Sequence, residues 1–242
     1  MPALPRLHTR DREATERMDD PDCDLSKLHR TYAQFHVINR VVAGWQQTYR
    51  RYLRPVLAHD RTNTLLDIGA GGADVTRAIA RWAHRDGFRI HITAADPDER
   101  ASAWAMRDNP GDLVYEQALS SDLVDAGRNF DLVISNHLLH HLQDDELQSL
   151  LHDSKQLARI RAVHSDIRRS QAAYMLFSAG TWPFFPGSFI REDGLVSIRR
   201  SYTAEEMAAA APSGWRVEFQ RPWRNLLIYD AEGATNPEPD QP

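Results

Sequence analysis

One stretch decides the fold of this chain: residues 65–74, which read LLDIGAGGAD. The apolar residues before Gly69 predict the end of a short buried strand, and the glycines predict a tight turn. After the turn, Val75, Ile79 and Trp82 recur at helical spacing, so a helix with one apolar face follows. A ligand is expected where such a strand ends and the helix begins.

Charge narrows the kind of ligand that this turn can hold. A helix N-terminus attracts phosphate, but Asp74 stands at the last position of the glycine pattern, where its carboxylate would repel a phosphate group. A cationic ligand is compatible with Asp67 and Asp74. A glycine turn without a ligand and a nucleotide-phosphate site stay open as alternatives.

The same residues resemble the cofactor loop of class I S-adenosylmethionine-dependent methyltransferases. The resemblance implies that Asp67, Gly69, Ala70, Gly71 and Asp74 bind S-adenosylmethionine, and that S-adenosylhomocysteine is the product. This cofactor carries a sulfonium and an ammonium group and no phosphate, which agrees with the acidic turn.

A second strand is predicted over residues 90–95, which are apolar and partly β-branched, and it ends at Asp96 and Pro97. An acid about one βαβ step after the glycine turn is placed to accept hydrogen bonds from ribose hydroxyls, so we expect Asp96 to bind the ribose. The alternative is an aspartate that caps the turn or the next helix.

Two more strands, over residues 113–118 and 130–136, complete the predicted cofactor side. In the resembling enzymes the first of them leads into the adenine region, which here contains Gln117, Ala118 and Leu119. The second ends at Asn136, which we also assign to the cofactor site.

Three histidines follow that strand, at positions 137, 140 and 141. A phenol or alcohol must lose a proton during methylation, and histidine is the side chain suited to remove it near neutral pH. We expect the general base to be His141 first, then His140, then His137; the alternative is that they are structural. We expect no metal, because His140 and His141 do not share a helix face, although His137 and His141 do, which leaves zinc as an alternative.

Two aromatic regions are candidates for the acceptor site. Tyr32 and Phe35 lie in a helical pattern over residues 24–58, and in the resembling enzymes such helices close over cofactor and acceptor. Tyr174, Phe177 and Trp182 lie in an insertion over residues 168–202 and predict an apolar acceptor wall. A homodimer interface or a local core could account for the same aromatics.

Five arginines lie in or beside this insertion: Arg168, Arg169, Arg191, Arg199 and Arg200. Most are expected to be solvated or paired with acids. Arg168 is our candidate for contact with an acidic or phenolate acceptor, which keeps carboxyl methylation open.

Composition agrees with one enzyme domain. The chain has 242 residues and a formal net charge of −5, which argues against a nucleic-acid-binding surface. The single cysteine excludes an internal disulfide and suits a reducing, cytoplasmic setting. No apolar run approaches the length of a membrane span.

The sequence therefore predicts a three-layer αβα sandwich with a seven-stranded, mostly parallel sheet, an N-terminal helical lid and an insertion after the fifth strand. Residues 1–23 are expected to be mobile until docked, residues 24–230 form the domain, and residues 231–242 form a disordered tail.

The likeness is narrower to bacterial methyltransferases found with natural-product pathways, including polyketide pathways. It implies O-methylation of a small, phenolic or otherwise hydroxylated, apolar metabolite. Alternatives are a carboxyl- or C-methyltransferase, and a protein of this fold that binds the cofactor without transferring the methyl group, as a cyclase or partner subunit.

Overall fold

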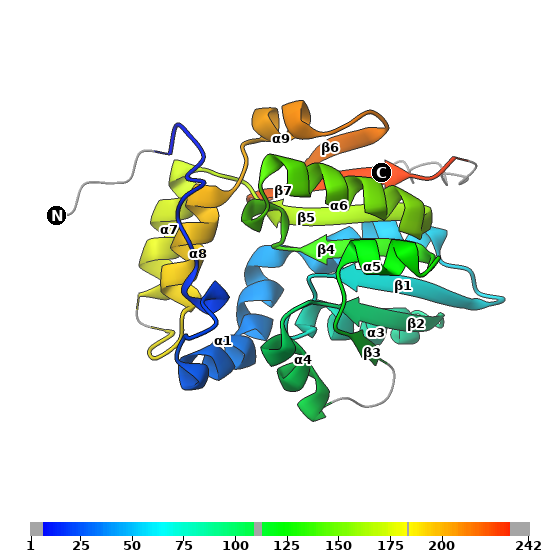
Figure 1. Cartoon of the computed structure of the whole chain (residues 1–242), viewed down its shortest axis with the longest axis horizontal. Helices are drawn as coiled ribbons and strands as arrows, with labels where there is room; N and C mark the ends of the chain where they lie inside the picture. Colours follow the sequence, from blue (N-terminus) through cyan, green and yellow to red (C-terminus); the bar gives the residue numbers. More distant parts are fainter. Residues whose placement is uncertain (1–6, 109–112, 183, 233–242) are drawn as a thin grey trace.

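Seven strands form one sheet in the order β3-β2-β1-β4-β5-β7-β6 (Figure 1). The computed structural model describes residues 7–108, 113–182 and 184–232. The strands are β1 (Thr62–Ile68), β2 (Arg89–Ala95), β3 (Leu113–Glu116), β4 (Phe130–Asn136), β5 (Ala158–Ile167), β6 (Trp215–Gln220) and β7 (Arg224–Asp230). Strands β1 to β5 run parallel, whereas β7 pairs antiparallel with both β5 and β6. The predicted seven-stranded, mostly parallel sheet is confirmed.

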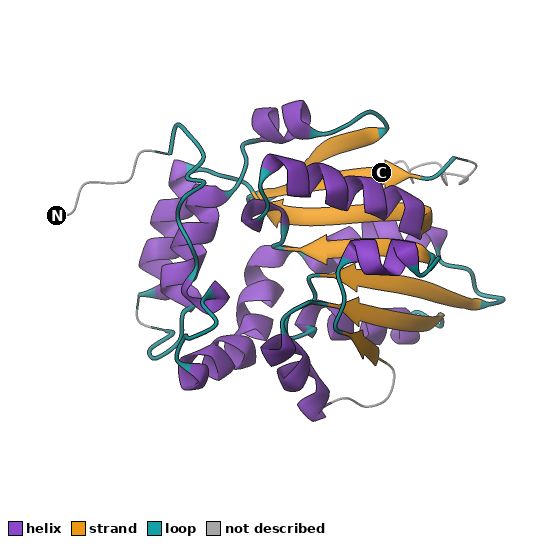
Figure 2. Ribbon diagram, in the orientation of Figure 1, coloured by secondary structure: helices purple, strands orange, loops and turns teal. Residues whose placement is uncertain are grey.

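Helices cover both faces of this sheet (Figure 2). Those in the described part of the chain are α1 (Leu25–Ile38), α2 (Trp45–Thr48), α3 (Asp74–Arg85), α4 (Glu99–Ala105), α5 (Ser120–Asp125), α6 (Asp144–Leu157), α7 (Gln171–Thr181), α8 (Ile190–Arg200) and α9 (Ala204–Ala210). Neighbouring residues of β1 point to opposite faces. Leu65 packs against Ile79 of α3, and Leu66 packs in the cluster that contains Leu151 of α6. The result is the expected αβα sandwich.

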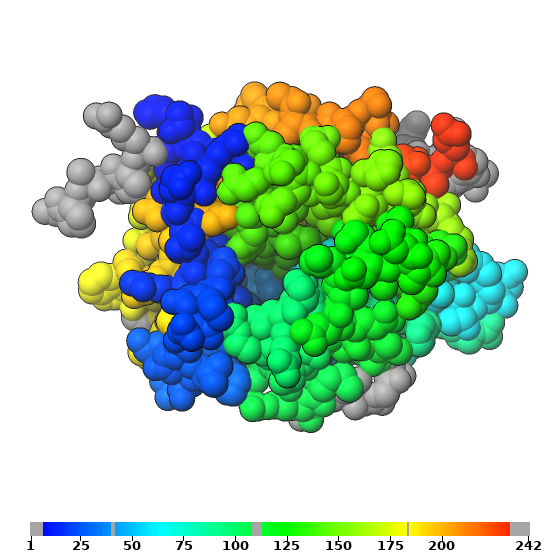
Figure 3. Space-filling view, in the orientation of Figure 1, coloured from blue at the N-terminus to red at the C-terminus, as the bar shows by residue number. Residues whose placement is uncertain are grey.

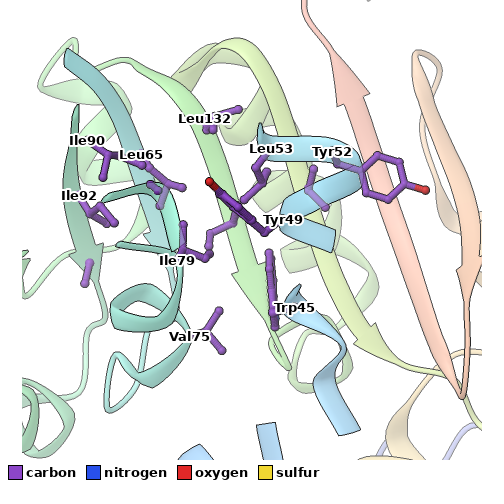
Figure 4. Packing of buried hydrophobic residues seen from close by; sticks show 14 of the residues in the cluster. Trp45, Tyr49, Tyr52, Leu53, Leu65, Val75, Ile79, Ile90, Ile92 and Leu132 are labelled. Carbon is purple, nitrogen blue, oxygen red and sulfur yellow. The ribbon is translucent and has the colours of Figure 1, made fainter. Parts of the chain in front are cut away.

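The N-terminal helices contribute to the core as well as to the lid. Trp45 of α2 and Tyr49, in the π-helical turn η3 (Tyr49–Leu53), pack with Leu65 and Leu132 of the sheet (Figure 4). Gly44 separates these residues from α1 and its π-helical extension η2 (Asn39–Ala43), since it takes a φ of 64°. The break leaves α1 free to lie beyond the carboxyl ends of β1 and β4, beside α7 and α8 (Figure 1).

Residues 7–23, expected to be mobile until docked, lie packed along α8 and the 3-10 turn η6 (Leu139–His141). Arg10 donates hydrogen bonds to the Tyr202 hydroxyl and to the carbonyl oxygen of Leu142, both at 2.7 Å. Asp193 of α8 accepts from the backbone N–H groups of Arg17 and Met18. From residue 233 onward, the tail expected to be disordered lies outside the described residues.

Candidate active site

The glycine turn follows β1 and is bound to the end of β2. The backbone N–H groups of Gly69 and Ala70 donate to the carbonyl oxygen of Ala95 at 2.8 and 3.2 Å. Gly71 has a φ of 52°, and a Cβ added to it would meet nothing within 4 Å, so the backbone there borders open space. Ala73 takes a left-handed φ of 58°, which is uncommon for a residue with a Cβ and typical of constrained functional loops.

Asp96 holds this turn from the next strand. One carboxylate oxygen accepts from the Gly71 N–H at 2.8 Å, and the other accepts from the Asp98 N–H at 2.9 Å. The Tyr115 hydroxyl donates to the Gly71 carbonyl oxygen at 2.9 Å. Each Asp96 oxygen keeps a further lone pair, so the carboxylate can also accept hydrogen bonds from a pair of ligand hydroxyls.

Two further carboxylates lie under and beside the turn. Asp67 is 2% exposed and accepts a hydrogen bond from the Thr76 hydroxyl, while its Oδ1 has no hydrogen-bond partner among the described residues. Burial raises the pKa of Asp67 to about 7, and it raises the pKa of Asp74 and Asp96 as well. Asp74 accepts from Asn39 of η2 at 2.8 Å. Buried carboxylates of this kind favour a cationic ligand.

A single cavity of about 1420 Å³ begins at this turn and extends toward the helical lid. Its lining includes Gly69, Ala70, Gly71, Asp74, Asp96, Pro97 and Asn136 from the predicted cofactor residues. In Figure 3 the molecule is hollowed between the N-terminal segment, in blue, and the green parts of the chain. The volume exceeds the ~300–1,000 Å³ that is usual for one ligand, so it has room for two.

Four predicted cofactor residues do not line the cavity. Asp67 lies beneath the turn. Gln117, Ala118 and Leu119 follow β3, where the Gln117 amide donates to the Pro97 carbonyl oxygen at 3.1 Å and Leu119 is exposed. Gln117 therefore supports the loop around Asp96 from outside the cavity.

His140 is buried between two carboxylates. Its Nδ1 donates to Asp166 at 2.7 Å and its Nε2 donates to Glu16 at 3.1 Å. Burial alone would lower the pKa of His140, but the charge of Asp166 and the hydrogen bonds to both acids raise it to about 9. Near neutral pH the ring is therefore protonated and cannot accept another proton.

His137 is held in the opposite state. Arg224 is fully buried and donates to His137 Nε2 at 2.9 Å, which requires this nitrogen to be unprotonated. Burial and the charge of Arg224 lower the pKa of His137 well below its usual value. The ring is therefore neutral and carries its proton on Nδ1. The backbone of His137 has a φ of 58°, because the chain turns sharply as it leaves β4.

His141 also lines the cavity, and one of its ring nitrogens makes no hydrogen bond to the described residues. Its Nδ1 donates to Asp19 at 3.1 Å, and its Nε2 lies 3.7 Å from Glu16, beyond hydrogen-bond length. Burial alone would raise the pKa of Glu16, but the charge of His141 and the hydrogen bond from His140 lower it to about 2. His141 therefore lies between Asp19 and the carboxylate of Glu16.

Of the six residues predicted to contact the acceptor, Tyr32, Phe35 and Phe177 line the cavity and three do not. Trp182 is 76% exposed, and Arg191 stacks over its ring at 5.1 Å. Arg168 stacks over Phe219 at 4.8 Å. Tyr174 is off the helix face that lines the cavity, which in α7 consists of Ala173, Leu176, Phe177, Gly180 and Thr181.

The other arginines beside the insertion are committed to protein partners. Arg200 donates to the carbonyl oxygens of His140 and His141 at 3.0 and 2.8 Å, and Arg169 forms an ion pair with Glu206. Arg199 is paired with Asp11 at 3.5 Å. This arrangement fixes the histidine turn and does not favour recognition of an acceptor carboxylate.

Four residues at the site were not predicted from the sequence: Glu16, Asp19, Asn39 and Arg224. Glu16 and Asp19 come from a charged segment that carries no motif. Arg224 stands directly before residues 225–229, whose pattern predicts only one strand of a C-terminal hairpin. The available signal in the sequence is that Arg224 is a charged residue directly before an apolar strand.

The chain belongs to the methyltransferase domain family, because residues 42–211, more than half of its length, match the family model of that description. Together with the acidic glycine turn and the sheet order, this match identifies a class I S-adenosylmethionine-dependent methyltransferase domain. In the described part of the chain, no helix is long and apolar enough to cross a membrane.

Proteins that are similar to this chain in sequence or in structure are methyltransferases by their names. A ubiquinone biosynthesis O-methyltransferase of Rhizobium leguminosarum is 31% identical over 86 residues, which span 34% of this chain and only 31% of that protein. The plantazolicin methyltransferase BpumL is 11% identical, with a TM-score of 0.58 over 88% of this chain and 91% of BpumL. The DszA carbon methyltransferase is 14% identical, with a TM-score of 0.56 over 89% and 60%.

Proposed function

We propose that this protein transfers the methyl group of S-adenosylmethionine to the hydroxyl oxygen of a small, apolar, phenolic metabolite. The observation that carries the proposal is the single cavity, which has the acidic glycine turn at one end and apolar residues of α1 and α7 with the histidine turn at the other. Donor and acceptor can therefore meet in one space.

The residues of the turn fit the cofactor. Asp96 has lone pairs for the two ribose hydroxyls, Gly71 leaves its backbone open, and the unpartnered Oδ1 of Asp67 with Asp74 supplies negative charge. When bound, S-adenosylmethionine supplies an electrophilic methyl group activated by the sulfonium. The protein has to hold the acceptor oxygen in line with it.

The walls of the other end suit an apolar aromatic acceptor. Phe35 and Phe177 border it from α1 and α7. The neighbouring arginines are bound to carbonyl oxygens, acids or rings, so the cavity favours a hydroxyl over a carboxylate. The name of the rhizobial relative, an O-methyltransferase, supports oxygen as the target.

We assign the general base to His141. Its Nδ1 donates to Asp19, so in the neutral ring Nε2 carries the lone pair that takes the acceptor's proton. His140 is protonated, and Nε2 of His137 already accepts a hydrogen bond from Arg224. We therefore assign both histidines the role of positioning the turn. As the acceptor O–H bond breaks, the new O–CH₃ bond forms and the bond from sulfur to methyl breaks.

The test is turnover of radiolabelled S-adenosylmethionine with a panel of phenols, catechols, benzoic acids and β-diketones. Methyl ethers of phenols as products, identified by mass spectrometry, support the proposal; methyl esters or C-methylated products would overturn its oxygen assignment. His141→Ala should reduce kcat ~100-fold or more with unchanged cofactor Kd, as expected for loss of a general base. Unchanged kcat would remove His141 as the base.

A protein that binds the cofactor and methylates nothing would correspond to the cyclase or partner-subunit alternative. Recovery of S-adenosylmethionine or S-adenosylhomocysteine from the purified protein by native mass spectrometry separates that case from an error in the cofactor assignment. Failure of both cofactors to bind would overturn the whole proposal.

A further inference from the structure

Acids and imidazoles alternate through the histidine turn. Asp166 contacts Nδ1 of His140 at 2.7 Å, and Nε2 of the same ring contacts Glu16 Oε1 at 3.1 Å. The same Glu16 oxygen lies 3.7 Å from Nε2 of His141, whose Nδ1 contacts Asp19 at 3.1 Å. Two ring nitrogens and one carboxylate oxygen thus converge, and each ring is anchored by a second acid at its far side.

We propose that Glu16, His140 and His141 form a binding site for a divalent transition-metal ion of the Zn²⁺ class. Imidazole nitrogen and carboxylate oxygen are ligands that such ions prefer, and two histidines with one glutamate is a recurrent set in sites that keep an open position.

The spacing of the three atoms fits one common ion. Ligands ~2.0–2.2 Å from the same metal lie ~3.0–3.5 Å from one another in octahedral or tetrahedral geometry. The two contacts to Glu16 Oε1 are 3.1 and 3.7 Å, and the three ligand atoms all lie within 4.8 Å of one another. The two contacts to Glu16 are close to this range, and the two histidine nitrogens would move toward each other, within the 4.8 Å that bounds them, as an ion enters.

The surroundings of the ligands match those of a metal site. A histidine that binds a metal almost always donates its other ring N–H to a carboxylate or carbonyl. Here Asp166 accepts from His140, and Asp19 accepts from His141. Arg200 binds the carbonyl oxygens of both histidines, which fixes the turn that carries them. Binding would replace the proton that His140 Nε2 now shares with Glu16.

The spacing rule for an α-helix does not apply to this pair of histidines. Adjacent histidines diverge on an α-helix, but His140 and His141 belong to the short 3-10 turn η6, and their rings lie 4.3 Å apart at a tilt of 34°. The third ligand comes from a residue 124 positions away in the chain. No local spacing in the sequence could have indicated it.

All three ligands border the cavity, so the open positions of the ion would face the acceptor. On the proposed function, the ion would bind the acceptor's hydroxyl oxygen and lower its pKa, with the proton passing to water. His141 is then a ligand in the loaded protein and the base in the metal-free protein. The ion site itself requires neither the cofactor nor an acceptor.

The test is direct metal binding by the full chain without a histidine tag. The protein is stripped with chelator and titrated with Zn²⁺ by calorimetry and with Co²⁺ by visible absorption, which reports nitrogen and oxygen coordination. Glu16→Gln and His141→Ala are compared with two controls: His137→Ala, a neighbouring cavity histidine, and His152→Ala, an exposed histidine on α6. Circular dichroism confirms that each variant is folded; His141 is the less buried ligand, so its variant remains informative if Glu16→Gln does not fold.

We expect one equivalent of Zn²⁺ to bind, at least a tenfold loss of affinity in both ligand variants, and unchanged binding in both controls. A loss of affinity in His137→Ala equal to that in His141→Ala would move the site and overturn the proposal. So would absence of binding in the wild type, or equal binding in all variants. Methyl transfer by a protein that binds no metal would leave the proposed function intact and remove only the ion site.

Discussion

Affinity for S-adenosylmethionine should rise steeply between pH 5.5 and 7, because Asp67 titrates in this range. Its folded-state pKa is about 7, raised by burial, so the carboxylate that attracts a cation is a minor species at pH 5.5. The ionised fraction grows from ~3% at pH 5.5 to ~50% at pH 7, which allows at most a ~16-fold gain in affinity, or ~1.7 kcal/mol.

The assay is isothermal titration calorimetry with S-adenosylmethionine at four pH values in that interval, each in two buffers of different ionisation enthalpy. Binding that favours the carboxylate releases protons, so the apparent enthalpy should depend on the buffer below pH 7. The upper limit of pH 7 keeps the ligand's α-amino group charged, since such groups titrate at ~7.7–8.0.

Asp67→Asn is the matched variant, because it keeps the shape of the side chain and removes its charge. We expect weaker binding than in the wild type at pH 7 and a shallower pH dependence. Any remaining slope belongs to the other cavity carboxylates whose pKa burial raises, which are Asp74, Asp96 and Asp193. Flat wild-type affinity across the interval, or an undiminished slope in the variant, would refute the electrostatic role given to Asp67.

Three other substitutions test separate parts of the site. Gly194→Ala should raise the acceptor KM and leave cofactor Kd unchanged, because the new Cβ would lie 2.4 Å from the Phe177 ring and push it into the cavity; steady-state kinetics measures both. Asn39→Ala should lower the unfolding free energy by ~0.5–1.5 kcal/mol in urea titrations, since it removes the hydrogen bond to Asp74. His137→Asn, which tolerates the φ of 58°, should alter acceptor KM more than kcat; a ~100-fold loss of kcat would show that the ring acts as the base.

Much of the fold could be predicted because its signals are local. The apolar run before Gly69, the helical spacing after it and the strands that end in Asp96 and Asn136 each follow from neighbouring residues. Their order then restricts the topology, since parallel strands need helical crossovers. The residues on the cofactor side of the cavity could be predicted for the same reason, because they lie at the ends of those strands.

The acceptor side could be predicted only in part, because it is built from segments far apart in the sequence. Aromatic residues in the insertion could be recognised as a group, but which of them face the cavity depends on the rotation of α7: Phe177 does, and Trp182 lies out in solvent. The same holds for arginines. The sequence suggested that Arg168 could bind an acceptor, but its guanidinium stacks on the ring of Phe219 in β6.

The three histidines show why residue type alone could not assign their roles. Their chemistry is set by partners from three other parts of the chain: Arg224 keeps His137 neutral, Asp166 keeps His140 charged, and Asp19 orients His141. Two of the carboxylates around this turn, Glu16 and Asp19, belong to the N-terminal segment, which carries no cofactor motif. Docking of that segment therefore completes the acceptor end of the site, and any condition that releases it should impair the histidine turn while leaving the cofactor turn intact.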